Sequence, residues 1–65
     1  MNDVVNLYDE RQAAKIISCS VALLRKWRLF CEGPAYVKIG RLVRYRQVDL
    51  DAFLDSHRVV TGGAR

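Results

Sequence analysis

Apolar and polar residues recur with the period of an α-helix over residues 20–30, which read S-V-A-L-L-R-K-W-R-L-F. At about 100° per residue, the apolar side chains fall on one side of this helix and the cationic ones on the other. Ser20 can cap the helix by accepting a hydrogen bond from the first turn, and residues 31–34 (C-E-G-P) end it. The predicted inner side holds Leu23, Leu24, Trp27 and Cys31, and the predicted outer side holds Ala22, Arg25, Lys26 and Leu29.

A second helix is predicted upstream, over residues 10–17. Asp9 and Gln12 have the spacing of a capping box, in which each side chain satisfies the backbone N–H of the other residue. The small Ala14 permits a close crossing with a neighbouring helix. The connection at residues 18–20 is very short, and Cys19 is expected to be its buried apolar residue. Two short helices joined by a tight turn, the second with a basic outer side, are typical of a helix-turn-helix.

After Pro34 the apolar residues no longer recur with the helical period. The new pattern predicts a β-hairpin that turns at Gly40-Arg41, with strands over residues 36–39 and 42–45. A basic hairpin beside a helix-turn-helix would be a wing, whose arginines could contact phosphates or the minor groove. A structural hairpin with solvated charges is the alternative. We expect Val37, Ile39, Val43 and Tyr45 to face inward, and Lys38, Leu42, Arg44 and Arg46 to face outward.

A third helix is predicted over residues 48–57, where Leu50, Phe53, Leu54 and His57 recur at helical spacing. Asp49 and Asp51 fall in its first turn, where acidic side chains favour the positive end of the helix dipole. This helix is expected to close the core.

The length of 65 residues predicts one domain with one small core. We expect a flexible N-terminus at residues 1–6, a domain at 7–58 and a flexible C-terminal tail at 59–65. The predicted fold is mainly α with a small β-hairpin, a winged helix-turn-helix. Neither a long apolar run nor a signal-peptide pattern is present, so a cytoplasmic, nucleoid-associated protein without a membrane partner is expected.

The net charge of +4 conceals a strong asymmetry along the chain. Between residues 21 and 46, seven Lys and Arg residues are opposed by Glu32 alone. Clustered positive charge is typical of proteins that bind a polyanion, because each neutralised phosphate releases condensed counterions. A solvated basic surface remains the simpler alternative.

The sequence contains few residue patterns that are typical of catalytic or metal sites. Cys19 and Cys31 lack C-x-x-C spacing, and the only histidine is His57, so no zinc site is expected. Asp49 and Asp51 point apart on a helix, and no Ser–His–Asp arrangement can be inferred. We therefore expect no enzyme, no metal and no cofactor.

The run G-P-A-Y-V-K-I-G-R-L-V-R-Y-R followed by V-D-L-D-A-F-L resembles the winged helix-turn-helix of excisionases and AlpA-type regulators, which are related to the DNA-binding domains of MerR-type activators. The upstream run D-E-R-Q-A-A-K-I-I-S-C-S-V-A-L-L-R-K-W resembles the first two helices of that family, so the resemblance covers residues 7–57. Leu23, where the family commonly has Thr, and the apolar Leu29 depart from the pattern.

The resemblance implies that the second helix enters the major groove of double-stranded DNA and that the wing contacts the adjoining minor groove or backbone. It places Ser20, Ala22, Arg25, Lys26 and Arg28 along the groove, and Lys38, Arg41 and Arg44 on the wing. A domain with one recognition helix reads few base pairs, so we expect cooperative self-association on repeated sites or a larger partner bound nearby.

Three functions remain open at this point. The first is an excisionase of a prophage or integrative element, a recombination directionality factor that bends DNA and directs an integrase toward excision. The second is a small AlpA-type transcription regulator that uses the same surface. The third is a basic module that binds an acidic protein or RNA. Trp27 could stack on RNA bases, but it falls on the inner side of its helix.

Overall fold

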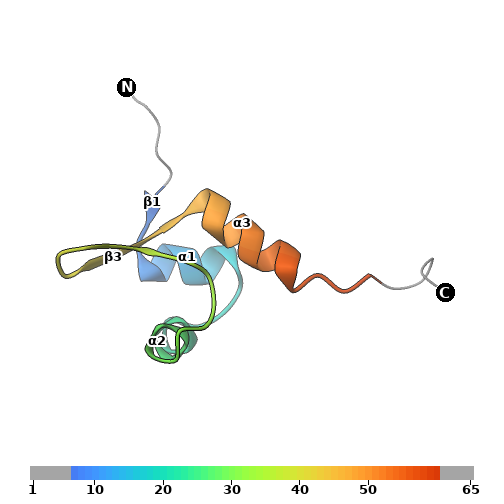
Figure 1. Cartoon of the computed structure of the whole chain (residues 1–65), viewed down its shortest axis with the longest axis horizontal. Coiled ribbons are helices and arrows are strands. Elements are labelled where there is room, and N and C mark those ends of the chain that lie inside the picture. The colour runs from blue at the N-terminus through green and yellow to red at the C-terminus, as the bar shows by residue number, and fades with distance from the viewer. Residues whose placement is uncertain (1–6, 61–65) are drawn as a thin grey trace, which may run out of the picture.

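The computed structural model describes residues 7–60 and contains three helices and a three-stranded antiparallel sheet, a mixed α/β architecture (Figure 1). The predicted flexible segments at residues 1–6 and 61–65 lie outside the described residues, while residues 59 and 60 have no regular structure. In chain order the elements are β1 (Leu7–Tyr8), α1 (Glu10–Ile16), α2 (Val21–Leu29), β2 (Val37–Ile39), β3 (Leu42–Arg46) and α3 (Gln47–Ser56).

The two predicted N-terminal caps are confirmed. The Asp9 carboxylate accepts a hydrogen bond from the Gln12 N–H at 2.9 Å, and the Gln12 side chain accepts one from the Asp9 N–H at 3.0 Å. The Ser20 hydroxyl accepts a hydrogen bond from the Leu23 N–H at 3.0 Å. Each cap satisfies N–H groups that the first turn of a helix leaves unpaired, so α1 and α2 begin at defined residues.

Helix α2 ends within one residue of the predicted end, but Cys31 does not lie on its inner side. The helix stops at Leu29, and Cys31 has a φ of +56°, which turns the chain out of the helix. Cys31 is therefore exposed, and its predicted place on the inner side of the helix is wrong. Gly33 then approaches Trp27 so closely that an added Cβ would lie 2.8 Å from the Trp27 Cβ, which explains the need for glycine in this turn.

The hairpin forms where predicted, but its two faces are not those predicted. The two-residue turn at Gly40-Arg41 pairs Ile39 with Leu42 and Lys38 with Val43. Cross-strand partners share a face, so Lys38 lies on the face of Val43 and Tyr45, while Val37 and Ile39 share the other face with Leu42, Arg44 and Arg46. The inward orientation predicted for Ile39 is wrong, and its side chain is 54% exposed.

Strand β3 is the centre of the sheet. It pairs with β2 on one side and with the two residues of β1 on the other, where Tyr8 lies opposite Tyr45. Tyr45 is fully buried, and the other buried core residues are Ala13, Ala14, Leu24 and Leu50. The two alanines let α1 approach its neighbours closely, and for Ala14 this was predicted.

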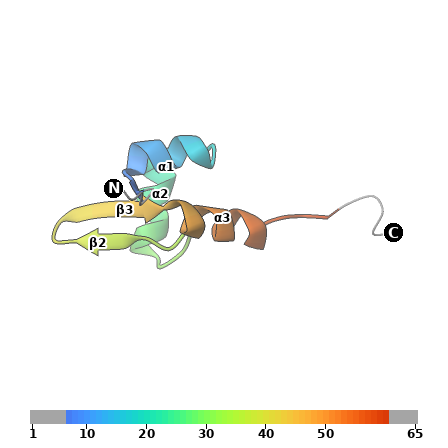
Figure 2. The ribbon, with the colours of Figure 1, turned by 90° about the horizontal axis from the view of Figure 1, so that it is seen from above.

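Helix α3 follows β3 without a loop and runs away from the rest of the domain (Figures 1 and 2). Its first turns are anchored by the buried Leu50 and by Phe53, whose ring lies 5.2 Å from that of Trp27. Leu54 and His57, which were expected to face the core, are exposed. The reason is that the far end of α3 extends beyond the elements that could cover it. Within residues 7–60, no helix combines the length and apolar composition that a membrane span requires.

Candidate nucleic-acid interface

The outer side of α2 is exposed as its pattern predicted. Ala22, Arg25, Lys26 and Leu29 all lie at the surface, and Leu29 is 76% exposed. The Ser20 side chain is at the surface too, but its hydroxyl is engaged in the helix cap. The helix therefore presents two cations and two apolar side chains on one side, a composition that suits both phosphates and thymine methyl groups.

Arg25 and Arg28 are both bound to a single carboxylate on α1. The Glu10 Oε2 atom accepts from Arg25 Nη2 at 2.5 Å, and the Arg25 Nε atom is 3.2 Å from each Glu10 oxygen. Arg28 Nη2 donates to Glu10 Oε1 at 3.2 Å. This bidentate arrangement joins α1 to α2 at the surface.

Arg28 is a structural residue as well as a candidate ligand of DNA. Its Nη1 atom donates to the Tyr45 hydroxyl at 2.9 Å, and its guanidinium lies 5.9 Å from the centre of the Tyr36 ring. Only 19% of its side chain is exposed, against 63% for Arg25. The structure thus places Arg28 between α2 and the hairpin, and leaves Arg25 and Lys26 as the accessible cations of the helix.

A cleft of about 430 Å³ separates the start of α1 and helix α2 from β3. It opens where β1 ends, because β1 reaches only Tyr45 and Arg46 of β3 and no other described residue pairs with β3 on that side. The cleft brings arginines of α2 and of the hairpin around one cavity. Its lining residues are Asp9, Glu10, Arg11, Arg25, Arg28, Arg41, Leu42, Val43 and Arg44.

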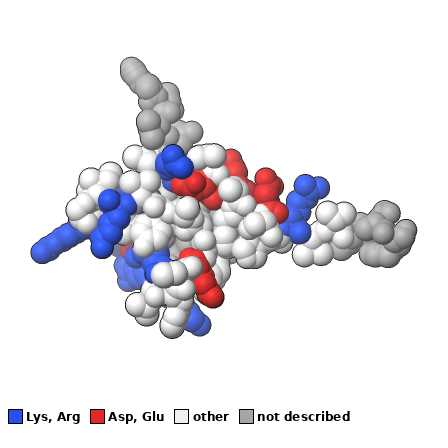
Figure 3. Space-filling view, in the orientation of Figure 1, with Lys and Arg blue, Asp and Glu red and all other residues white. Residues whose placement is uncertain are grey.

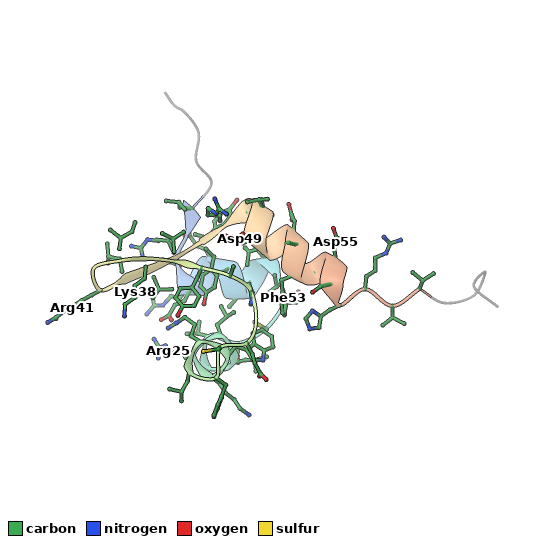
Figure 4. All side chains as sticks on the ribbon, viewed as in Figure 1. Arg25, Lys38, Arg41, Asp49, Phe53 and Asp55 are labelled. Atoms are coloured by element: carbon green, nitrogen blue, oxygen red, sulfur yellow. The ribbon has the colours of Figure 1, made fainter. Side chains whose placement is uncertain are left out.

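The three predicted wing residues differ in their surroundings. Lys38 and Arg41 are exposed, and Figure 4 shows both on the side of the molecule that carries Arg25. Arg44 is half-buried and donates to the Val43 carbonyl oxygen at 2.8 Å. Since Lys38 and Arg44 lie on opposite faces of the hairpin, the predicted one-sided basic ribbon is wrong, and Arg44 reaches the cleft while Lys38 does not line it.

Most positive side chains lie over the hairpin and α2 and most negative ones along α3, although cations also flank α3, where Arg46 is paired with Asp49 and Arg58 follows the helix (Figure 3). Cations gather over the hairpin and α2, whereas Asp49 and Asp55 lie on α3, away from Arg25, Lys38 and Arg41 (Figure 4). Glu10 and Glu32 are the acidic exceptions near α2. Cationic side chains are therefore concentrated over α2 and the hairpin, as expected of a surface that attracts a polyanion.

Two carboxylates paired with arginines are expected to add a small acid dependence to the stability of the domain. The Arg25 hydrogen bond lowers the pKa of Glu10 from the ordinary value of 4.5, and the Arg46 hydrogen bond, at 2.9 Å, lowers the pKa of Asp49 from 3.8. A lowered folded-state pKa adds stability that is complete above the ordinary pKa and is lost as the pH falls through the lowered one. We predict that the melting temperature begins to fall near pH 4.5, and that Glu10→Gln/Asp49→Asn loses this part of the decline. An unchanged acid profile in the double variant would contradict the assignment.

The possible metal ligands and the cysteine of the turn have the following surroundings among residues 7–60. No three His, Cys, Asp or Glu side chains in this range are close enough to share a metal ion. Cys19 packs against the core, as expected for the turn, and burial raises the pKa of its thiol. A raised pKa disfavours the thiolate, so this cysteine has the character of a structural residue.

The sequence patterns did not identify Glu10, Arg11 and the Tyr45 hydroxyl as parts of this surface. Glu10 could be recognised only as the first residue of a helix, because its partners lie 15 and 18 positions away.

Comparison with known proteins finds no family model and no curated protein that match the chain. The resemblance to excisionases and AlpA-type regulators therefore stays a prediction from its motifs.

Proposed function

We propose that this chain is a winged helix-turn-helix protein that binds double-stranded DNA. In this proposal α2 is the recognition helix in the major groove, with Arg25, Lys26 and Leu29 facing the bases and backbone. The β2–β3 hairpin is the wing, and Lys38 and Arg41 contact the adjacent strand or minor groove. The observation that carries the proposal is the cleft at which arginines of α2 and of β3 meet beside an exposed cationic helix.

Within this class, the motif resemblance favours an excisionase over an AlpA-type transcription regulator. An excisionase would bind repeated sites cooperatively, bend the DNA and direct an integrase toward excision. A transcription regulator would use the same surface at a promoter. A footprint on the ends of the element that encodes the chain would separate the two functions, because protection of repeated sites there supports excision and protection of a promoter alone supports regulation.

The DNA-binding proposal is tested by fluorescence anisotropy with a labelled random duplex over 50–300 mM salt. With about four phosphate contacts, log K should fall with log salt with a slope of roughly −3 to −4. Single-stranded RNA of equal length serves as the competing ligand. The absence of duplex binding at 50 mM salt, or tighter binding to RNA than to the duplex, would contradict the proposal.

The wing is tested separately by Arg41→Ala. Arg41 is exposed at the hairpin turn, where Gly40 has a φ of +61°, so its side chain can be truncated without disturbing the core. If it neutralises one phosphate, affinity should fall on all duplexes alike and the salt slope should become shallower by about one ion. Arg58→Ala, beyond the end of α3, is the charge-matched control. Equal slopes for the two variants would remove the wing from the interface.

A further inference from the structure

Glu10 occupies one of the two donor edges with which Arg25 could bind a phosphate through paired N–H groups. An arginine binds a phosphate or carboxylate most strongly through two parallel N–H donors, and the Nε and Nη2 donors of Arg25 are both directed at Glu10. The other edge, formed by Nη1 and the second N–H of Nη2, has no partner among the hydrogen bonds of the described residues. The most accessible arginine of α2 is therefore already paired with an anion of the same chain.

The other arginine on this carboxylate is held far more firmly. Arg28 is fixed by the Tyr45 hydroxyl at 2.9 Å and is mostly buried, whereas the Arg25 side chain is 63% exposed. If Arg25 moved away, Glu10 would keep its 3.2 Å contact with Arg28 and would not be left as an unpaired charge. Moving Arg25 from Glu10 to an external anion therefore costs little free energy, since exposed ion pairs contribute little to stability.

We propose that Glu10 is a positioning residue that competes with the DNA backbone for Arg25 and so restrains binding to DNA of any sequence. This inference rests on the proposed function. The carboxylate holds the Nε and Nη2 edge of Arg25 and leaves Nη1 directed away from the pair. Phosphates reach Arg25 in full only by displacing Glu10, which reduces the number of counterions released on non-specific binding.

The test compares Glu10→Gln with Asp49→Asn in titrations of a random duplex. Both variants remove one negative charge, and both release an arginine from a bidentate pair, because Arg46 donates to the two Asp49 oxygens at 2.9 and 3.2 Å. Only Glu10→Gln releases an arginine on α2. Glutamine also keeps an oxygen that can accept from Arg28, and circular dichroism checks that both variants fold.

Glu10→Gln is expected to bind the random duplex about five- to tenfold more tightly at 0.1 M salt, with a salt slope steeper by about one ion. Asp49→Asn should leave the slope unchanged. The gain should disappear in Glu10→Gln/Arg25→Ala compared with Arg25→Ala, because Glu10 acts through Arg25.

Three results would overturn the inference. Equal gains in duplex affinity for the two single variants would show an effect of net charge alone. A gain that persists in the Arg25→Ala background would show that Glu10 does not act through Arg25, and a loss of affinity in Glu10→Gln would show that the ion pair aids binding. Each of these leaves the proposed function intact, since the wild-type chain still binds the duplex. Failure of every protein, wild type included, to bind would contradict the proposed function and this inference with it.

Discussion

Trp27→Ala is expected to lower the free energy of unfolding by about 3 kcal/mol, at the lower end of the range for core aromatic truncations, because the indole is only partly buried. A domain of this size has a total stability of roughly 3–10 kcal/mol, so most of the population could unfold. The indole packs on the Phe53 ring at 5.2 Å and lies directly against Gly33, so it joins α2 both to α3 and to the turn that precedes the hairpin.

Urea denaturation followed by circular dichroism measures this loss, because the variant has no tryptophan to report by fluorescence. Leu29→Ala, on the exposed side of the same helix, is the control and should change stability by no more than about 0.5 kcal/mol. A stable Trp27→Ala variant would mean that α3 and α2 do not depend on each other through this contact.

Arg25→Ala/Lys26→Ala is expected to weaken duplex binding by roughly ten- to a hundredfold at 0.1 M salt and to make the salt slope shallower by about two ions. These are the two accessible cations of α2, and neither packs in the core. Loss of a base contact at Arg25 would also relax sequence preference. The fold should be retained, and the melting temperature at neutral pH should fall only by the small contribution of the exposed Arg25–Glu10 pair.

The matched control is Lys15→Ala/Arg58→Ala, which removes the same charge from the outside of α1 and from the end of α3. If this control loses as much affinity as the α2 variant, binding depends on net charge and α2 is not a recognition helix. If neither variant loses affinity, the duplex lies on another face of the molecule.

Local signals predicted the helices and the hairpin because their determinants lie within a few residues. The Asp9 capping box and the Ser20 cap connect residues three positions apart, and both bonds are present. The turn at Gly40-Arg41 also formed where it was predicted. The pattern of apolar residues did not determine which residues of the two strands pair across that turn. A two-residue turn places Ile39 opposite Leu42, and this parity determined that Lys38 and Arg44 lie on opposite faces.

The missed parts of the candidate site depend on contacts between distant residues. Glu10 meets Arg25 and Arg28 only because Ala13 and Ala14 let the first two helices cross closely. Arg28, placed along the groove by the family resemblance, is bound to Tyr45 from the third strand. The sequence showed which cations are clustered along the chain, whereas tertiary packing determined which of them remain accessible.

The charge asymmetry separates the proposed interface from the rest of the surface. Helix α3 carries Asp49, Asp51 and Asp55, and its C-terminal end extends away from the hairpin. Repulsion between these carboxylates and phosphates would orient the duplex toward the opposite side of the domain. The exposed Leu54 and Val48 on α3 then stay clear of DNA in this arrangement.

The central claim is that α2 and the hairpin form one DNA-binding surface, and it is tested most directly by titrating the ¹⁵N-labelled chain with a duplex in low salt. Backbone amide shifts at residues 22–29 and 38–44 are expected to change together, while those at residues 51–56 of α3 remain unchanged. Changes centred on α3, or changes in the helix without any in the hairpin, would contradict the claim.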